Sequence, residues 1–284
     1  MAYHIWQVGV DIQNGCMRAL AVQRCRHGWQ LRHWWQFPLP GDTLRLGSLY
    51  HADGLCEILR QWRRELPRFI SLRVGFPASQ ILQQRLPQPD KRLREPARGE
   101  YIEKMALRKL PVSRDMLALD YRTDPQIADT LLVTAARNAE LVAWQDCFSQ
   151  SGLEPEVMDI TPCALRCMAQ QAGLLSERLL LHRFDDHWLW TSPLNHPLHF
   201  GTFQPEDITD KQALISHLST CYQMATEEPV YCSSSIADDL SGMSEMLISW
   251  SPLVAFHQQH PPLPPMPSAF VIAGGLALRP GDTY

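Results

Sequence analysis

The chain has 284 residues, of which 45% are hydrophobic and 20% charged, as expected for one large globular domain or two smaller ones. No apolar run approaches the ~18–20 residues that span a bilayer, and the N-terminal residues lack the basic and apolar segments of a signal peptide, so we expect a cytoplasmic protein. The formal net charge of −4 divides into +10 over residues 1–114 and −14 over residues 115–284.

Three strands open the chain and are joined by short turns. Their apolar residues fall within 5–12, 17–24 and 29–37. The segment HADGLCEILRQWRREL follows with apolar residues at helical spacing, and ISLRVGFP is typical of a buried strand that Pro77 ends. Three strands, a helix and a strand form the repeating half of the ribonuclease-H-like fold.

Residues 78–136 change this order and predict a small inserted subdomain. It contains a strand in ILQQRLP, a helix in LREPARGEYIEKMALRKL, and strands in LALDYRT and TLLVTAAR. The chain then continues with the amphipathic helix NAELVAWQDCFSQSGL, the strand EPEVMDI and a helix that begins TPCALRC. We therefore predict a first domain at 1–165, with the insertion at 78–136, and a second, reduced domain at 166–284.

The second half predicts shorter elements. Strands are expected in RLLLHRF, HWLWTSP, PLHFGTF, EPVYCSS and EMLISWS, with a helix in DITDKQALISHLSTCYQMA. The polyproline stretch HPPLPPMP is either a stiff surface linker, which we favour, or a ligand of an SH3-type domain. The apolar SAFVIAGGLALRP predicts a helix, or a strand followed by a helix.

The first hairpin, VGVDIQNGCMRALAV, carries a candidate site. Asp11 lies at the mouth of a polar turn with Asn14, Gly15 and Cys16, and Arg18 follows on the second strand. Backbone N–H groups of such turns bind phosphate, and a carboxylate holds Mg²⁺ directly or through water. Actin-type ATPases hold metal and phosphate with a hairpin of this kind.

Four stretches of the chain resemble the PilM-type actin-like proteins of type IV pilus assembly. They are VGVDIQNGCMRAL, YIEKMALRKLPVSRDMLALDYRT, LLVTAARNAELVAWQDCFSQSGLEPEVMDITPCAL and AFVIAGGLALR, of which the last two are the most specific. The resemblance implies an α/β, two-domain actin-like (ribonuclease-H-like) ATPase fold with a small strand–helix–strand–strand insertion in the first domain.

The resemblance also implies a vestigial nucleotide cleft. Its candidate residues are Asp11, Asn14, Gly15, Cys16, Arg18 and Asp159. In actin-like folds an acid at the position of Asp159 faces the interdomain cleft. Alternatively, Asp159 is a strand-end acid that interacts with the N-terminus of the following helix.

The chain departs from the family pattern at each of the three expected nucleotide contacts. In the first turn, Gln13 replaces a glycine and Arg18 a lysine. In the second, His182 falls on the aspartate position and Phe184 on the glycine position, and the serines at 233–235 stand where an adenosine-binding glycine turn is expected. A Cβ resists the backbone conformation and close phosphate approach that glycine permits. We therefore expect no enzymatic activity and no bound cofactor, although ATP with magnesium remains the alternative.

As a function, the resemblance implies an adaptor on the cytoplasmic side of the inner membrane, in a type IV pilus-like or DNA-uptake (competence, DNA utilization) machinery. It would hold the N-terminal cytoplasmic tail of a PilN- or HofN-like bitopic inner-membrane protein, in a groove between the first domain and its insertion. A PilO- or HofO-like protein and a secretin would be indirect partners. The alternative is an active actin-like ATPase that binds Mg-ATP in the interdomain cleft.

Charge and cysteines point to neither nucleic acid nor metal. The basic residues of 1–114 either solvate helix faces or help docking on an acidic partner or anionic lipid, and no recognition helix or stacking motif predicts direct DNA binding. The eight cysteines form no C-x-x-C pair, and Cys163 and Cys167, one helical turn apart, fit reduced thiols packed on a helix. We expect peripheral membrane association, chiefly through the partner.

Overall fold

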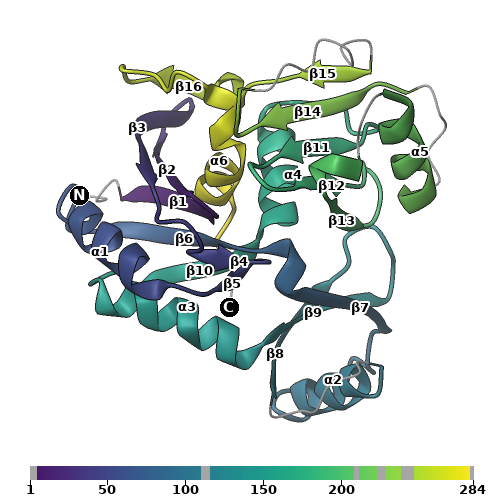
Figure 1. The fold of residues 1–284 in the computed structure, drawn as a ribbon. Coiled ribbons are helices and arrows are strands. Elements are labelled where there is room, and N and C mark those ends of the chain that lie inside the picture. Colours follow the sequence, from purple (N-terminus) through teal and green to yellow (C-terminus); the bar gives the residue numbers. More distant parts are fainter. Residues whose placement is uncertain (1–4, 110–115, 208–210, 223–227, 238–245, 282–284) are drawn as a thin grey trace.

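The computed structural model describes residues 5–109, 116–207, 211–222, 228–237 and 246–281. These residues form two larger sheets side by side, with a smaller three-stranded sheet attached to the first (Figure 1). No helix in the described part of the chain is long and apolar enough to cross a membrane.

The first sheet has six strands in the order β10-β6-β1-β2-β3-β16. Its strands are β1 (Trp6–Gln13), β2 (Cys16–Cys25), β3 (Gly28–Pro38), β6 (Ile70–Phe76), β10 (Pro155–Ile160) and β16 (Phe256–Gln259). Strands β1, β2 and β3 form an antiparallel meander, and β6 pairs in parallel with both β1 and β10. A two-stranded ribbon, β4 (Leu44–Arg45) and β5 (Ser48–Leu49), follows β3.

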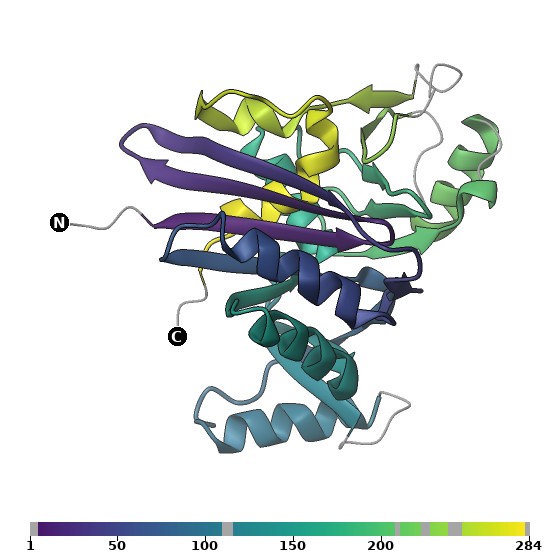
Figure 2. The ribbon, with the colours of Figure 1, turned by 60° about the vertical axis from the view of Figure 1, so that its left-hand side comes forward.

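Helices cover both faces of the first sheet, which explains why β1 and β2 are apolar almost throughout. On one face, Val8, Val10 and Ile12 pack against α1 (Ala52–Arg63) and α3 (Asn138–Gln150). On the other lies α6 (Val271–Leu278), and Figure 2 shows the strands between these two helical layers.

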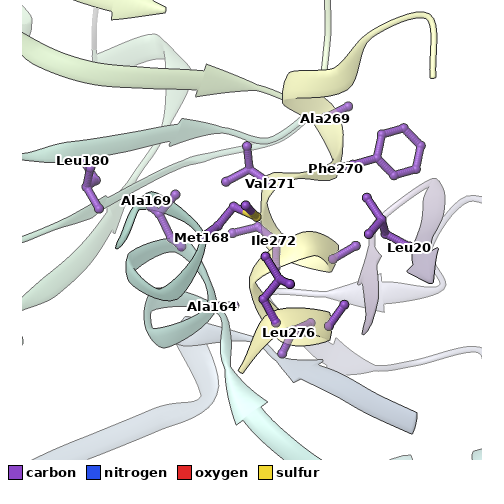
Figure 3. Packing of buried hydrophobic residues seen from close by; sticks show 14 of the residues in the cluster. Leu20, Ala164, Met168, Ala169, Leu180, Ala269, Phe270, Val271, Ile272 and Leu276 are labelled. Carbon is purple, nitrogen blue, oxygen red and sulfur yellow. The ribbon is translucent and has the colours of Figure 1, made fainter. Parts of the chain in front are cut away.

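Helix α6 packs between the two sheets beside α4 (Thr161–Gln171), and all eight of its residues are buried. Its contacts with the neighbouring backbone are close because two glycines permit them. A Cβ on Gly9 of β1 would lie 2.0 Å from the Ala273 carbonyl oxygen, and one on Gly275 would lie 1.8 Å from that of Ala164. Figure 3 shows the resulting apolar cluster, which joins Leu20 of the first sheet to Leu180 of the second.

The second sheet has five strands in the order β13-β12-β11-β14-β15. They are β11 (Leu180–Arg183), β12 (Trp188–Thr191), β13 (Phe200–Phe203), β14 (Val230–Ser234) and β15 (Leu247–Ser249). Its outer face packs against α5 (Lys211–Tyr222) through Leu214 and Leu218. Alternation along β11 divides its side chains between two cores, because Leu180 faces α6 and Leu181 faces α5.

The insertion consists of β7 (Ile81–Pro87), α2 (Ala97–Leu107), β8 (Leu117–Thr123) and β9 (Thr130–Arg137), the order that the sequence predicts. Its sheet runs β7-β9-β8, and α2 covers one face through a small core of its own (Figure 1). The residues of this core are Leu86, Ile102, Ala106, Leu131 and Val133. The opposite face of the sheet turns toward the rest of the molecule.

Two segments of 166–284 lie against the first sheet. Strand β16 pairs in parallel with β3, and α6 packs on β1, β2 and β6. Residues from both sides of the proposed boundary between 165 and 166 therefore belong to the first sheet or pack on it. The domain limits stay a prediction. The polyproline stretch follows β16 and is fixed to β3, since Trp34 Nε1 donates to the Pro262 carbonyl oxygen at 2.8 Å.

Candidate functional site: an interdomain cleft and a groove

Five of the six predicted site residues lie together on the β1–β2 hairpin. The register pairs Asp11 with Arg18 and Gln13 with Cys16, around a turn in which Gly15 adopts a positive φ of 85°. The Asp11 side chain is 1% exposed, and its Oδ1 accepts a hydrogen bond from Gln13 Nε2 at 2.6 Å. The residue that replaces the family's glycine thus binds the carboxylate that would serve a metal.

Burial dominates the electrostatics of this carboxylate. Desolvation raises the pKa of Asp11 to about 6, against the lowering effects of the Gln13 hydrogen bond and the Arg18 charge. Its Oδ2 has no hydrogen-bond partner among the described residues, nor do Nε and Nη1 of Arg18 or Oδ1 of Asn14. The hairpin therefore holds a charged pair of residues with incomplete hydrogen bonding.

The second turn, between β11 and β12, is filled by aromatic side chains. His182 is fully buried between two serines, with Nδ1 2.8 Å from Ser233 Oγ and Nε2 3.0 Å from Ser235 Oγ. Burial lowers the pKa of His182 to about 3, so the ring is neutral near pH 7. Phe184 is 1% exposed, and its ring lies edge-on to His182 and stacks on His187, at centroid distances of 4.5 and 4.6 Å.

Arg18 joins the first hairpin directly to the segment that follows β14, where the third nucleotide contact was expected. Its side chain is 3% exposed, and Nη2 donates to the Ser235 carbonyl oxygen at 3.0 Å across 217 positions of sequence. Where a nucleotide site needs open backbone N–H groups in both turns, this chain has a guanidinium, an imidazole and a phenyl ring. These residues do not fit a magnesium-bound triphosphate. Among the described residues, no cluster of three or more His, Cys, Asp or Glu side chains could hold a metal ion.

Asp159, the sixth predicted residue, lies at the end of β10 and takes a different partner. Its Oδ2 accepts from Arg279 Nε at 2.5 Å, and its Oδ1 accepts from the N–H of Ile160, the N-cap residue of α4. Arg279 directly follows α6, so this ion pair connects the end of the interior helix to the edge of the first sheet. The sequence did not predict this pairing.

A groove separates the insertion from the first sheet. It contains a cavity of about 320 Å³ whose walls come from β8, β9, α3 and β10. The uncovered face of the insertion contributes three apolar side chains and one hydroxyl group: Ala118, Leu132, Ala136 and Thr134. Strands β8 and β10 are both edge strands, so the cavity lies between two sheet edges.

A second cavity of about 720 Å³ adjoins the first. Arg122, Asp159 and Arg279 line both, and the second continues between α4 and the 194–198 segment. Here the insertion contacts the second sheet's connections, because Arg85 Nη2 donates to the Leu198 carbonyl oxygen at 2.7 Å and Gln126 Nε2 to that of Leu194 at 3.3 Å. The groove is thus bordered by all three sheets or their loops.

A family model described as "Type IV pilus assembly protein PilM" matches residues 9–179, which is more than half of the chain. The chain belongs to the PilM family. The DNA utilization protein HofM of Escherichia coli strain K12 is 30% identical over 285 residues, with all of both chains covered. This confirms the resemblance that the four stretches indicate.

Solved structures confirm the actin-like α/β fold. A "PilM-PilN type IV pilus biogenesis complex" matches this PilM-family chain with a TM-score of 0.73 and 17% identity, covering 97% of this chain and 98% of that one. The cytoplasmic domain of EpsL, an inner-membrane component of the type II secretion system of Vibrio cholerae, matches with a TM-score of 0.54 and 12% identity, covering 94% and 93%. At these identities the matches establish the fold alone.

Several residues of the PilM-family chain that shape the two sites were not singled out from sequence. Arg279 lay within the recognised terminal stretch, but nothing in its spacing indicated Asp159 as its partner. Arg122 and Cys163, which meet across the groove with Nη2 and Sγ 2.8 Å apart, come from different elements. Arg18, by contrast, was singled out from the sequence, because a short hairpin places it opposite Asp11.

Proposed function

We propose that this protein is a non-catalytic adaptor that binds the N-terminal cytoplasmic tail of a PilN-like inner-membrane protein. The observation that carries the proposal is the cavity between the edge strands β8 and β10. An extended peptide can add backbone hydrogen bonds at such edges, while side-chain pockets select its sequence. The likeness to a PilM–PilN complex supports a PilN-like partner.

The same proposal places the protein at the cytoplasmic face of the inner membrane. The tail would hold it there as a peripheral protein, and the partner would connect it to a PilO-like protein and a secretin. The machinery would be a type IV pilus or a DNA-uptake system, in keeping with the description of the HofM relative. Basic residues of 1–114 would add only a secondary attraction to anionic lipid.

Calorimetric titration of the tail peptide of the PilN-like protein from the same organism tests this function. Ala136→Trp would fill the cavity that Ala118 and Ala136 line, and we expect it to abolish binding. Leu82→Trp is the matched control, because Leu82 is 42% exposed on neighbouring β7 and is not part of the cavity wall. Equal binding by both variants, or none by the wild type, contradicts the proposal.

We further propose that the nucleotide cleft is degenerate and that no cofactor is used. The direct Arg18–Ser235 hydrogen bond, the Gln13–Asp11 hydrogen bond and the buried ring of Phe184 support this. A ligand at 100 times its Kd raises stability by ~2.7 kcal/mol, so a thermal-shift titration detects even moderate binding. We expect no shift with Mg-ATP. Micromolar binding that disappears in Asp11→Ala would favour the alternative, an active ATPase.

A further inference from the structure

Strand β8 is the edge of the insertion sheet and faces the groove. The order β7-β9-β8 leaves one side of β8 without a neighbouring strand in that sheet. Its side chains alternate between two faces, and Leu119 and Tyr121 pack toward the core under α2. Asp120 and Arg122 therefore lie on the groove face, where both line the 320 Å³ cavity.

The Asp120 side chain accepts a hydrogen bond from a backbone N–H group of the β8 edge. In the free protein the Tyr121 N–H donates to Asp120 Oδ1 at 2.8 Å, and a strand added along β8 would replace this hydrogen bond with one to its own backbone. The Asp120 side chain is exposed, and no ion pair to it is present in the described part of the chain. Its negative charge is available to a ligand in the groove.

Arg122 lies two residues further along, where the two cavities meet. Its Nη2 donates to Cys163 Sγ at 2.8 Å. Burial raises the pKa of Cys163 to about 12, so this partner is a neutral thiol near pH 7. The charges of Asp159 and Asp120, which line the same cavity, also act on the guanidinium and help to raise the pKa of Arg122. No carboxylate forms an ion pair with Arg122 among the residues that the structure describes.

The spacing of these two charges matches the side-chain repeat of a strand. Side chains opposite one another on neighbouring strands lie about 5 Å apart, and those on one face recur every second residue, about 7 Å along the strand. We propose that a tail added along β8 places a basic side chain against Asp120 and an acidic side chain against Arg122, with one residue between them. This rests on the proposed function and gives the chemistry of its partner.

The charge pair would also fix the register of the bound tail. Opposite charges directly across a strand pair are favourable and like charges are unfavourable. A slip by one residue turns both charged side chains to the other face of the added strand, away from Asp120 and Arg122. The small apolar side chains Ala118 and Ala136 cannot supply this discrimination, because they accept many apolar residues of a tail.

Affinities of the PilN-like tail for Asp120→Asn and Arg122→Gln test the proposal. We expect each to weaken binding about tenfold, as for loss of a charged partner in a half-buried site. Glu100→Gln and Arg108→Gln are matched controls, because these residues lie on α2 and in the turn after it, away from the groove wall. Circular dichroism and melting curves verify that all four variants fold.

Charge exchange gives the sharper result. A double variant, Asp120→Lys with Arg122→Glu, should no longer bind the natural tail of the partner. It should instead bind a tail peptide in which the basic and acidic residues are exchanged. Absence of rescue, or groove variants that bind as well as the controls, overturns the charge proposal and leaves the adaptor function intact. A tail without a base and an acid one residue apart also overturns it. If the wild type binds no tail, the proposed function itself fails.

Discussion

Arg18, Asp11 and His182 form a buried polar cluster between the two larger sheets. A buried charge costs several kcal/mol unless hydrogen bonds and an opposite charge compensate it. Arg18 has one hydrogen bond to Ser235, and Asp11 has one to Gln13. His182 avoids the cost by staying neutral between two hydroxyl groups. The cluster thus connects the sheets without contributing much net stability.

The raised pKa of Asp11 predicts a stability that depends on pH. A carboxyl that titrates near pH 6 when folded and near 3.8 when unfolded stabilises the protein below pH 4, and this contribution is lost as the pH rises from there through about 6. We expect wild type to lose ~1.4 kcal/mol relative to Asp11→Asn between about pH 5 and about pH 8. Urea unfolding of both proteins at the two pH values measures the difference.

A wild-type protein whose stability changes in parallel with that of Asp11→Asn would contradict this assignment. Cys16 and His182 titrate far from this range, because burial raises the pKa of Cys16 and lowers that of His182 to about 3. They therefore do not imitate the effect. Groups that do not interact with Asp11 change both proteins equally, so the difference reports Asp11 together with its charge coupling to His187 and Asp185.

Residue partners were the least predictable part of the site. The sequence places Asp11, Asn14, Gly15, Cys16 and Arg18 on one hairpin, because a short turn between two apolar strands fixes their neighbourhood. It could not supply Ser235 for Arg18, which lies 217 positions away, since side-chain direction depends on how the two sheets pack. The ion pair of Asp159 was equally unpredictable, because its partner Arg279 is 120 positions away in the sequence.

Helix α6 determines how the elements fit together. It touches β1, β2 and β6 on one side and α4 on the other, so a change in its surface disturbs both sheets. Figure 3 shows that Met168, Ile272 and Leu276 fill the space between them. Its apolar composition was read from the sequence as a helix or strand–helix, and the structure has a short 3₁₀ turn followed by a helix.

Gly275→Ala should destabilise the protein through this contact. The new Cβ would lie 1.8 Å from the Ala164 carbonyl oxygen, which is backbone and yields only if α4 and α6 separate. We expect a loss of at least ~1–3 kcal/mol in the free energy of unfolding, the usual cost of overpacking. Gly41→Ala is the control, because nothing lies within 4 Å of its Cβ position. Denaturant unfolding that is equal for both variants would refute the close approach.

Among the elements, periodicity predicted the long ones and missed β16. The helices α1 and α3 and the four elements of the insertion follow from apolar spacing and turn residues. Strand β16 has four residues, of which three are exposed, so no burial pattern marks its pairing with β3. The domain boundary at residue 165 was predicted from the order of the elements along the chain. That order does not show that β16 and α6 return to the first sheet.

In the whole molecule, the groove is connected to both larger sheets. The insertion contacts the second sheet's loops through Arg85 and Gln126, and Arg122 reaches α4 through Cys163. The Arg279–Asp159 pair borders the same groove from the end of α6. A ligand in the groove therefore touches residues that hold the three sheets in their relative positions.

Membrane attachment is expected to depend on the partner. In cells that lack the PilN-like protein, we expect this protein in the soluble fraction, because a held tail fixes it more firmly than dispersed basic residues do. With the partner present, moderate salt should release only a minor share, since screening weakens exposed charges but spares a buried peptide. Fractionation and immunoblotting measure both. Persistent membrane binding without the partner, removed by salt, would identify lipid charge as the anchor.

The position of α6 in the chain has a consequence for synthesis on the ribosome. The inner faces of β1, β2 and β6 are made early, yet the helix that covers them is the last one described. Until residues 271–278 leave the exit tunnel, the nascent chain exposes the apolar surface around Leu20 and Val22. Such surfaces attract chaperones and promote aggregation. Nascent chains from which α6 has not yet emerged should therefore bind ribosome-associated chaperones more strongly than chains from which it has emerged.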